Sequence, residues 1–324
     1  MRSPTLAMLP KAPADRSGWP WTEESDQLPD MMPDGRPWPM ISIVTPLYNQ
    51  EGWVEETIRS VLLQGYPNYE HLIINDGSTD GSLAVAEKYA PWVKCITQKN
   101  AGQSAALNRG FRMAEGELIG WQNSDDCYGV DNFKEGALGS VKYPDYEIYN
   151  GATRGFRESD FRPPWLFEAC EEFTHADFLR HMGVMNQSMF FRRVVFERGV
   201  FIKEDMHYAM DPDFFWRLSL AGFRFKLLPT MIGYYRQQSL AKSTSYRLRG
   251  DLEGYGILRW LSRDERLEPE FRREARRKMR WNLLRSLRKA RSSVPGKLVP
   301  ELILPIRSAN PSSVSQDPGK AVKL

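Results

Sequence analysis

Residues 41–62 read ISIVTPLYNQEGWVEETIRSVL, and this stretch decides the fold. Its first five residues, Ile41 to Thr45, form a short run rich in β-branched side chains, which favours a strand. Apolar residues then recur at helical spacing, at Val54, Ile58, Val61 and Leu62. The stretch therefore predicts a strand that is followed by a helix.

The strand–helix unit repeats along the next sixty residues. Strands are predicted at His71–Ile74, Val93–Ile96 and Leu118–Trp121, and a helix is predicted at Ser104–Met113. Ser78, Thr79 and Asp80 supply N-cap chemistry for a further helix that carries Leu83, Val85 and Ala86. This alternation predicts an α/β protein with a mainly parallel sheet flanked by helices.

In such sheets, ligands bind beyond the carboxyl ends of the strands. The predicted strands end in the polar segments Thr45–Asn49, Asn75–Ser78 and Gln122–Asp126. Three strands are therefore expected to deliver their most polar residues to one edge of the sheet.

The whole chain divides into four parts. Residues 1–38 are rich in Pro, Asp, Ser and Trp without periodicity, and an extended or disordered arm without a core is expected there. Residues 39–245 form the main domain, with a helix predicted near Pro212–Leu220, and its second half is expected to shape the site of a second substrate. Residues 246–292 are predicted to be a basic helical extension, and residues 293–324 a disordered tail.

Composition excludes several classes of protein. The net charge of the 324 residues is +3, which is too small to imply a nucleic-acid partner for the whole chain. The three cysteines are odd in number and far apart, so neither a disulfide framework nor a zinc site is indicated, and a reducing cytoplasm fits best. No stretch approaches the roughly 18 apolar residues that span a bilayer, and residues 1–18 lack a continuous apolar run, so we expect neither export nor integration into a membrane.

Carboxylates at the predicted strand ends are candidate ligand-binding groups. Asp125 and Asp126 can hold a hard divalent cation through oxygen ligands, and such a cation can bridge a diphosphate. The alternative is a polar turn that caps the next element. Asp76 can accept hydrogen bonds from a base or a ribose, with Gly77 allowing close approach of the backbone. Its alternative is a turn at a helix start, capped by Ser78 or Asp80.

A third polar segment lies at the start of a predicted helix. Asn100–Ser104 is followed by Asn108, Arg109 and Gly110, and the backbone N–H groups at a helix start favour anions. Gln103 and Arg109 are therefore candidates for contact with a nucleotide. A tight loop followed by an ordinary helix is the alternative.

Taken together, these segments resemble the glycosyltransferase family 2 enzymes of GT-A fold in order and spacing. The segments are Ile41–Gln50, Ile73–Ser82, Gly102–Gly110 and Gly120–Asp126, and Asn186–Arg193 and Tyr208–Leu218 are similar to the family's acceptor-side segments. The resemblance covers about Met40 to about Ser245. It implies a Rossmann-like GT-A sheet, with the helical segment as a C-terminal extension.

The resemblance also implies roles for individual residues. Thr45, Pro46 and Tyr48 would line the nucleotide pocket, Asp76 would bind the base, Asp125 would contact ribose or sugar, Asp126 would bind Mg or Mn, and Asp211 would be the catalytic base. An inverting transfer needs one carboxylate to take the proton of the acceptor hydroxyl, which is a reasonable role for Asp211. The alternative for Asp211 is an N-cap ahead of Pro212, and Asp213 is assigned to structure because it lies on another face of the helix.

Two positions depart from the family's pattern. Met210 stands where many members have an acidic residue, and Gln238 stands where we align a metal-ligating histidine. An amide oxygen can ligate Mg or Mn, so Gln238 is a candidate metal ligand and an altered metal dependence is our hypothesis. The four histidines show no ligand spacing and are expected to be structural or exposed, and Cys127 is expected to be a buried, inert thiol.

Dense Arg and Lys between Phe271 and Arg291 indicate a basic amphipathic helix. One face of it carries Phe271, Ala275, Met279, Leu283 and Leu287. Such a helix can lie on an anionic membrane surface, which would suit a lipid-linked acceptor, or it can pack on the catalytic domain with a solvated basic face. No stacking platform or known module accompanies the charge, so RNA is not the expected partner.

The expected function is an inverting, metal-assisted glycosyltransferase that takes a sugar from a nucleoside diphosphate donor to a hydroxyl of a glycan or lipid-linked saccharide, in polysaccharide synthesis. Its location would be cytoplasmic, with peripheral contact at the inner face of the membrane. Two alternatives stay open. One is a nucleotidyltransferase, which should carry a Gly-rich phosphate loop that residues 45–50 do not form. The other is a nucleotide-sugar-binding protein that has lost catalysis, as Met210 and Gln238 would allow.

Overall fold

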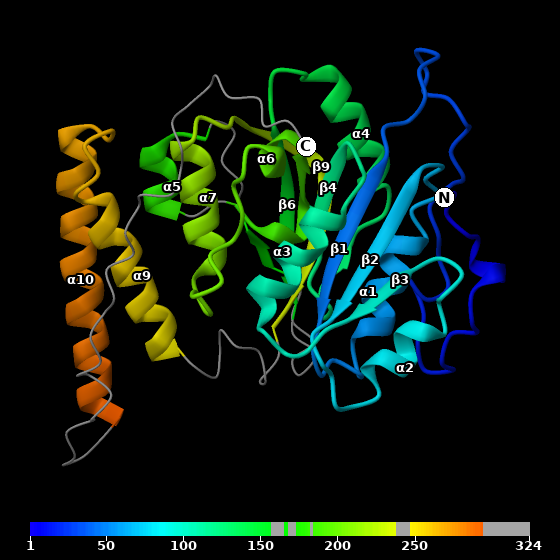
Figure 1. Cartoon of the computed structure of the whole chain (residues 1–324), viewed down its shortest axis with the longest axis horizontal. Coiled ribbons are helices and arrows are strands. Elements are labelled where there is room, and N and C mark those ends of the chain that lie inside the picture. Colours follow the sequence, from blue (N-terminus) through cyan, green and yellow to red (C-terminus); the bar gives the residue numbers. More distant parts are fainter. Residues whose placement is uncertain (157–164, 168–172, 182–183, 238–246, 294–324) are drawn as a thin grey trace.

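The computed structural model describes residues 1–156, 165–167, 173–181, 184–237 and 247–293, and one mixed sheet runs through it (Figure 1). Its first half is parallel, in the order β3-β2-β1-β4. These strands are β1 (Ile41–Leu47), β2 (Tyr69–Asn75), β3 (Lys94–Thr97) and β4 (Leu118–Trp121). The predicted α/β class and all four predicted strands are confirmed.

The second half of the sheet continues from β4 in the order β8-β6-β9-β5. Its strands are β5 (Cys127–Tyr128), β6 (Ile148–Phe156), β8 (Met189–Arg192) and β9 (Phe225–Arg236), with β7 (Trp165–Phe167) paired to β6. Only β6 and β9 run parallel in this half, and β8 is antiparallel to both of its neighbours. The long strand β9 thereby brings its last residue, Arg236, back to the end of β4, as the contacts of its side chain show below.

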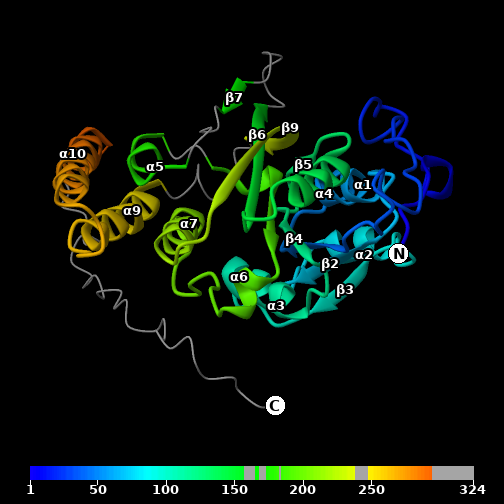
Figure 2. The ribbon, with the colours of Figure 1, turned by 90° about the horizontal axis from the view of Figure 1, so that it is seen from above.

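Helices cover both faces of the sheet (Figure 2). The helices α1 (Val54–Leu62) and α4 (Asn132–Lys142) lie on one face, and α3 (Gln103–Met113), α6 (Val194–Glu197) and α7 (Met210–Leu220) on the other. The remaining helical segments are η1 (Leu6–Met8), α2 (Ser82–Glu87), α5 (His175–His181), η2 (Asn186–Ser188), α9 (Arg247–Leu261) and α10 (Pro269–Ser293). The predicted apolar face of α1 is confirmed, because Val54, Ile58, Val61 and Leu62 are fully buried.

The N-terminal arm, residues 1–38, belongs to the core. Four of its apolar side chains are at most 7% exposed, namely Leu9, Trp21, Met32 and Trp38, and all of them except Trp21 join the hydrophobic cluster that contains α1 and α4. The expectation that this arm contributes no core is therefore wrong. Its anchors are single residues without a helical or strand period, and each fills a separate gap on the domain surface. Regular structure in the arm is limited to η1 and one isolated bridge between Met31 and Pro37.

The arm also surrounds a buried cation on α1. The guanidinium of Arg59 is 1% exposed and donates to the carbonyl oxygens of Pro10, Pro20 and Trp21 at 2.9 to 3.1 Å. The ring of Trp21 lies 5.2 Å from the same group. Because these acceptors come from the arm, the arm is needed to satisfy a charge that the domain buries.

The helices α9 and α10 pack against α5 and α7. The ring of Phe271 lies 5.5 Å from that of Trp216 on α7 and 6.1 Å from that of His175 on α5. Ala275 is fully buried, whereas Leu283 is 38% exposed. The first half of α10 is thus a packed helix, and its apolar face emerges toward solvent further along; the side chain of Leu287 lies outside the described residues. Among the helices of the described chain, none combines the length and the apolar character needed to cross a bilayer.

Candidate active site

The candidate active site is built around Asp126, between the end of β4 and the start of β5. The side chain is 1% exposed. Its Oδ2 accepts hydrogen bonds from the side-chain amides of Asn123 at 3.0 Å and Gln187 at 2.8 Å, and its Oδ1 accepts one from the backbone N–H of Arg236 at 2.9 Å. A carboxylate has about four acceptor positions, so these three donors leave room for one more partner.

Two effects raise the pKa of Asp126 to about 7. Burial is the larger one, because it disfavours the charged form, and the neighbouring carboxylate of Asp125 adds like-charge repulsion. The hydrogen bonds from Gln187, Arg236 and Asn123 act in the opposite direction. A cation bound between or beside the two carboxylates would stabilise their charged forms.

Arg236 and Glu56 hold the backbone next to these carboxylates. The Arg236 side chain is 2% exposed, and its Nε donates to the carbonyl oxygen of Asp125 at 3.0 Å while its terminal nitrogen pairs with Glu56 at 2.8 Å. The guanidinium carbon lies 4.6 Å from the ring centres of both Trp53 and Phe156. Packing and charge therefore fix this side chain in one place.

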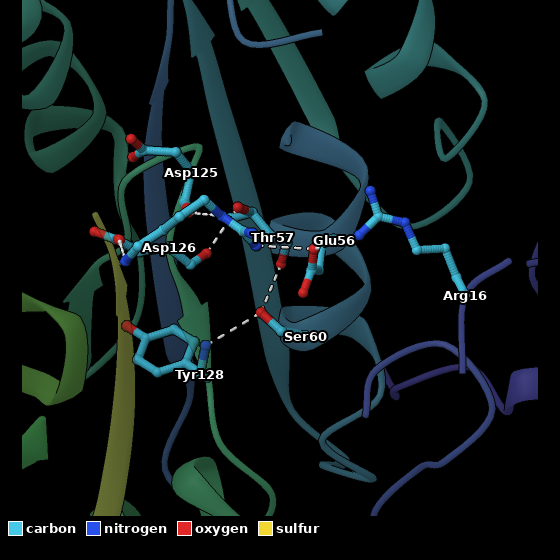
Figure 3. A network of polar contacts seen from close by, with 8 residues as sticks. Arg16, Glu56, Thr57, Ser60, Asp125, Asp126 and Tyr128 are labelled. Carbon is cyan, nitrogen blue, oxygen red and sulfur yellow. Dashed lines mark hydrogen bonds and ion pairs between the residues drawn. The ribbon is translucent and has the colours of Figure 1, made fainter. Parts of the chain in front are cut away.

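Figure 3 shows how this network continues through α1. The hydroxyl of Thr57 donates to the carbonyl oxygen of Asp126 at 2.7 Å, and the hydroxyl of Ser60 accepts from the backbone N–H of Tyr128 at 3.2 Å. On the outer side, Arg16 of the N-terminal arm lies 3.9 Å from Glu56. The first turns of α1 thus support the main chain on both sides of the two carboxylates.

The donor set at this edge fits a hard divalent cation. Asp125 and Asp126 offer carboxylate oxygens, which Mg²⁺ and Mn²⁺ prefer, and a bound cation would favour the charged form of Asp126, whose pKa is raised by burial and by Asp125. Within the described residues, no group of three or more His, Cys, Asp or Glu side chains is arranged to hold a metal. Water or a ligand's own oxygens would have to complete the coordination. Gln238, the other predicted metal ligand, lies outside the described residues.

Asp76 lies in a hydrogen-bond network at the loop before α3. It is 2% exposed, and its Oδ1 accepts from the Gln98 side chain at 2.8 Å and the backbone N–H of Ala101 at 2.9 Å, while its Oδ2 accepts from Gly102 at 2.8 Å. Arg109 joins this cluster through a hydrogen bond to Gln98 at 3.2 Å. Asp76 therefore holds the loop before α3, and contact with a nucleotide base stays a prediction.

Residues at the end of β1 are divided between the core and the surface. Thr45 and Pro46 are buried, and the Thr45 hydroxyl lies 2.9 Å from Nε2 of His71. Burial lowers the pKa of His71 to about 3, so this imidazole is neutral and structural, as expected. Tyr48 is 46% exposed. Of the three residues at the end of β1 and just after it that are predicted to line a nucleotide pocket, Tyr48 is the one that solvent or a ligand reaches most readily.

The start of α3 connects the loop of Asp76 to Asp126. Gly102 precedes the helix with φ of +93°, a conformation that glycine adopts without strain. The next residue, Gln103, donates from its side chain to Asn123 at 3.0 Å, and Asn123 in turn donates to Asp126. The predicted residues Asp76, Gln103 and Asp126 are thus brought together at one edge of the sheet.

Asp211 lies in the first turn of α7, where Ala209 is the N-cap residue without a side-chain cap bond. The alternative of Asp211 as the N-cap is therefore wrong, because α7 begins at Met210, one residue before Asp211. Burial raises the pKa of Asp211 to about 6, and the charge of Glu253 contributes in the same direction. Asp213, in contrast, forms ion pairs with Lys203 at 3.1 Å and Arg217 at 2.7 Å, which confirms its structural assignment.

The start of α7 is fixed by α3 and by α9. The Ser104 hydroxyl lies 2.9 Å from the sulfur of Met210 and donates to the carbonyl oxygen of Met206 at 3.0 Å. The Glu253 carboxylate on α9 accepts from three successive backbone N–H groups, those of residues 207, 208 and 209, at 2.7 to 3.0 Å. A carboxylate from the C-terminal helices therefore orders the turn before Asp211.

Sequence reasoning missed several supporting residues of this site. They are Glu56, Asn123, Gln187, Arg236 and Glu253. Gln187 and Arg236 lie within or beside segments that carry the family resemblance, so their position was a usable signal. Glu56 and Glu253 are separated from their partners by long stretches of chain, and no local pattern marks them.

These features define an α/β protein with a paired carboxylate centre at the carboxyl ends of parallel strands. Residues 42–200 match the sequence model of the family described as Glycosyl transferase family 2. The chain therefore contains a glycosyl transferase family 2 domain.

Among curated proteins, the chain is similar to the uncharacterized glycosyltransferase EpsJ of Bacillus subtilis (strain 168). The two are 31% identical over 216 residues, which is 61% of each chain. The chain thus spans about three fifths of the length of this relative.

Solved structures share the fold. The S. aureus TarS 1-349 complex with UDP-GlcNAc matches with a TM-score of 0.58 at 19% identity, over 73% of this chain and 70% of that one. The mannosyltransferase PcManGT from Pyrobaculum calidifontis, in complex with GDP-Man and Mn2+, matches with a TM-score of 0.56 at 18% identity, over 84% and 80%. This likeness establishes the GT-A-like fold.

Proposed function

We propose that this protein is a glycosyltransferase that moves a sugar from a nucleoside diphosphate sugar to an acceptor hydroxyl, with inversion at the anomeric carbon. The observation that carries the proposal is the Asp125–Asp126 pair at the carboxyl edge of a family 2 domain, where Asp126 is buried, Asp125 is half-buried and Arg236 supports the backbone. A buried carboxylate beside a second one is costly to fold, and a bound cation with an anionic ligand offsets that cost.

The donor proposal draws on the solved structures that share the fold. TarS is described in complex with UDP-GlcNAc, and PcManGT with GDP-Man and Mn2+. A uridine or guanosine diphosphate sugar is therefore the first donor class to test on this chain. The start of α3, with Gly102 and Gln103 beside Asn123, offers backbone N–H groups near the centre where a diphosphate would lie.

In the proposed reaction, Asp211 accepts the proton of the acceptor hydroxyl as its oxygen attacks the anomeric carbon. The bond to the diphosphate oxygen breaks on the opposite face, and the nucleoside diphosphate leaves with the bonding electrons. A divalent cation held by Asp125 and Asp126 would supply charge neutralisation for the diphosphate. The pKa of about 6 for Asp211 suits a base that is ionised at neutral pH yet basic enough to take a proton. The acceptor is proposed to be a glycan or a lipid-linked saccharide.

The test is calorimetric binding of UDP-, GDP- and dTDP-sugars, with and without Mn²⁺, to the wild type, to Asp126→Ala and to Asp34→Ala. Asp34 is a matched control because it is an exposed carboxylate paired only with its neighbour Arg36. We expect metal-dependent binding of one nucleotide class that is weakened by at least about 100-fold in Asp126→Ala and unchanged in Asp34→Ala.

Absence of nucleotide binding in the folded wild type would contradict the proposal. Binding without sugar transfer to any hydroxyl acceptor, and without slow hydrolysis of the donor, would instead identify a nucleotide-sugar-binding protein that has lost catalysis. Ordinary tight Mn²⁺ dependence that survives Gln238→Ala would show that the altered metal dependence we proposed from that position is wrong.

A further inference from the structure

A second charged site lies between α9 and α10, in a part of the molecule that the proposed reaction does not use. The two helices enclose a pocket of about 700 Å³. Four arginines line it: Arg259 from α9, Arg263 just after the end of that helix, and Arg272 and Arg276 from α10. Tyr255 and Met279 complete its walls together with Ser262.

Helical spacing places these side chains in two facing rows. Residues 255 and 259 lie four positions apart on α9, as do residues 272 and 276 on α10, so each pair shares one helix face, and Arg263 follows the end of α9. The neighbouring faces are fixed by burial, because Leu258 and Leu261 of α9 and Ala275 of α10 belong to the core. The helices therefore cannot roll to turn the arginines away from the pocket.

The four guanidinium groups lack partners in the described part of the chain. None of them has a side-chain hydrogen bond or an ion pair there, whereas nearby carboxylates are engaged elsewhere. Asp264 binds Arg266, and Glu270 and Glu274 lie close to Arg273 and Arg277. The Nε of Arg272 is buried without a hydrogen-bond partner among the described residues. Burying such a donor without an acceptor is unfavourable.

Arg259 and Arg272 are half-buried, unlike the residues of an ordinary solvated basic face, whereas Arg263 and Arg276 are exposed at the rim of the pocket. The side chains of Arg273 and Arg277 on the same helix are 70% and 80% exposed, and water can satisfy them. The pocket arginines instead converge on one volume and gather like charges there. Guanidinium groups bind phosphate oxygens through paired N–H donors, so a phosphate group would satisfy both their charge and their geometry.

We propose that the pocket between α9 and α10 binds a phosphate-bearing anion. The chemistry is that of a phosphate or diphosphate group, supplied either free in solution or as the headgroup of an anionic lipid. The lipid source has a specific observation behind it: Trp281 and Leu284, further along α10, are 57% and 55% exposed. Exposed Trp and Leu beside basic residues are typical of helices that lie at a membrane surface. The inference does not rest on the proposed transfer reaction.

The test uses the full chain and two probes. Inorganic pyrophosphate is titrated calorimetrically with EDTA present, and vesicles of phosphatidylcholine with and without phosphatidic acid are used in co-sedimentation. The pocket variant is Arg272→Gln with Arg276→Gln, and its charge-matched control is Arg273→Gln with Arg277→Gln on the same helix. We expect the pocket variant to weaken binding about tenfold or more, and the control to weaken it less than about threefold.

The outcomes separate the two sources and can overturn the inference. Pyrophosphate binding that is lost in the pocket variant supports the site with a free anion, and vesicle binding lost in the same variant alone supports a lipid headgroup. Equal losses in both variants would show diffuse surface charge and overturn the proposal, as would a wild type that binds neither probe. Loss of the pyrophosphate signal in Asp126→Ala would also overturn it, because the binding would then belong to the sheet edge. Arg259→Gln with Arg263→Gln repeats the test from α9 if the first variant unfolds at lower temperature.

Discussion

Two buried charges lie on either side of α1, and the protein compensates them differently. Arg59 faces the N-terminal arm, where three carbonyl oxygens and the hydroxyl of Tyr89 surround its guanidinium, the last at 3.3 Å. Asp126 lies near the opposite side, where three donors surround its carboxylate but the carboxylate of Asp125 lies beside it. The fold supplies hydrogen-bond partners around the Arg59 guanidinium, whereas it leaves the Asp126 carboxylate next to a like charge.

We interpret the difference as one between a structural charge, Arg59, and a charge proposed to bind a ligand, Asp126. Fixed dipoles around Arg59 replace the water that it lost. At Asp126 the same kind of replacement is incomplete, so the pKa is raised to about 7. Asp126 lies at the edge of the sheet where ligands bind, and burial disfavours its charged form. We therefore expect a ligand to bind beside it.

The comparison predicts its largest effect at Asp211, the other carboxylate whose pKa burial raises. Asp211→Asn should lower kcat by about 100- to 10,000-fold, because removal of a general base costs that much, while nucleotide-sugar affinity stays within about threefold. Steady-state transfer assays and calorimetry measure the two quantities.

Asp213→Asn is the control for that change, two residues further along the same helix. It should lower thermal stability, because it breaks the ion pairs to Lys203 and Arg217, and should change kcat much less. If the two variants lost kcat equally, Asp211 would not be the base.

At Arg59 the comparison predicts a change in stability rather than in chemistry. Arg59→Met should lower the free energy of unfolding by about 2–4 kcal/mol, because several buried carbonyl oxygens lose their only donor. Urea denaturation measures the change. The exposed arm residue Arg36, changed to Met, should have an effect below about 0.5 kcal/mol. A stable Arg59→Met protein with low kcat would contradict the structural role.

Arg236 sharpens the comparison because it is a buried cation that serves the functional charge. Arg236→Lys should lower kcat/KM by about 10- to 100-fold, since a lysine can pair with Glu56 but cannot also reach the Asp125 carbonyl with a planar fork. The control is Arg16→Gln, which removes the 3.9 Å outer contact to Glu56 and should leave activity nearly unchanged. If Arg236→Lys gave the same Mn²⁺ titration curve as the wild type, the support that Arg236 gives to the Asp125 backbone would be dispensable.

The smallest effect concerns pH. Because Asp211 must be ionised to act as the base, activity should fall as the pH is lowered through about 6. Glu253 contributes to the raised pKa of Asp211, so Glu253→Gln should move this limb of the pH profile to lower pH. The pH dependence of kcat/KM for both proteins measures the shift. A limb that moved upward or stayed in place would show that the charge of Glu253 does not reach Asp211.

Local patterns in the sequence were enough for the parallel half of the sheet and for the strand ends that carry Asp76, Asp125 and Asp126. They succeed there because the central strands are short apolar runs buried on both faces and the helices bury one face at helical spacing. They fail for the arm, whose anchors such as Trp21 have no period. They also fail for Arg236 and Glu56, which lie 180 positions apart and meet only because β9 returns to β4 and α1. The α7 start was predicted to within two residues, but its stabilisation by Glu253 depends on a helix that follows forty residues later.

The arm that surrounds Arg59 has a consequence for how this domain can be moved between proteins. The match to the family model runs from residue 42 to residue 200, yet a fragment cut at those points would lose the carbonyl oxygens that Arg59 binds on one side and the Phe214 ring that packs on Phe191 and Phe196 on the other. The segment that matches the family model is therefore shorter than the segment that is needed to form the folded domain. Recombination or domain grafting should therefore succeed only when the arm and the C-terminal helices travel with the sheet.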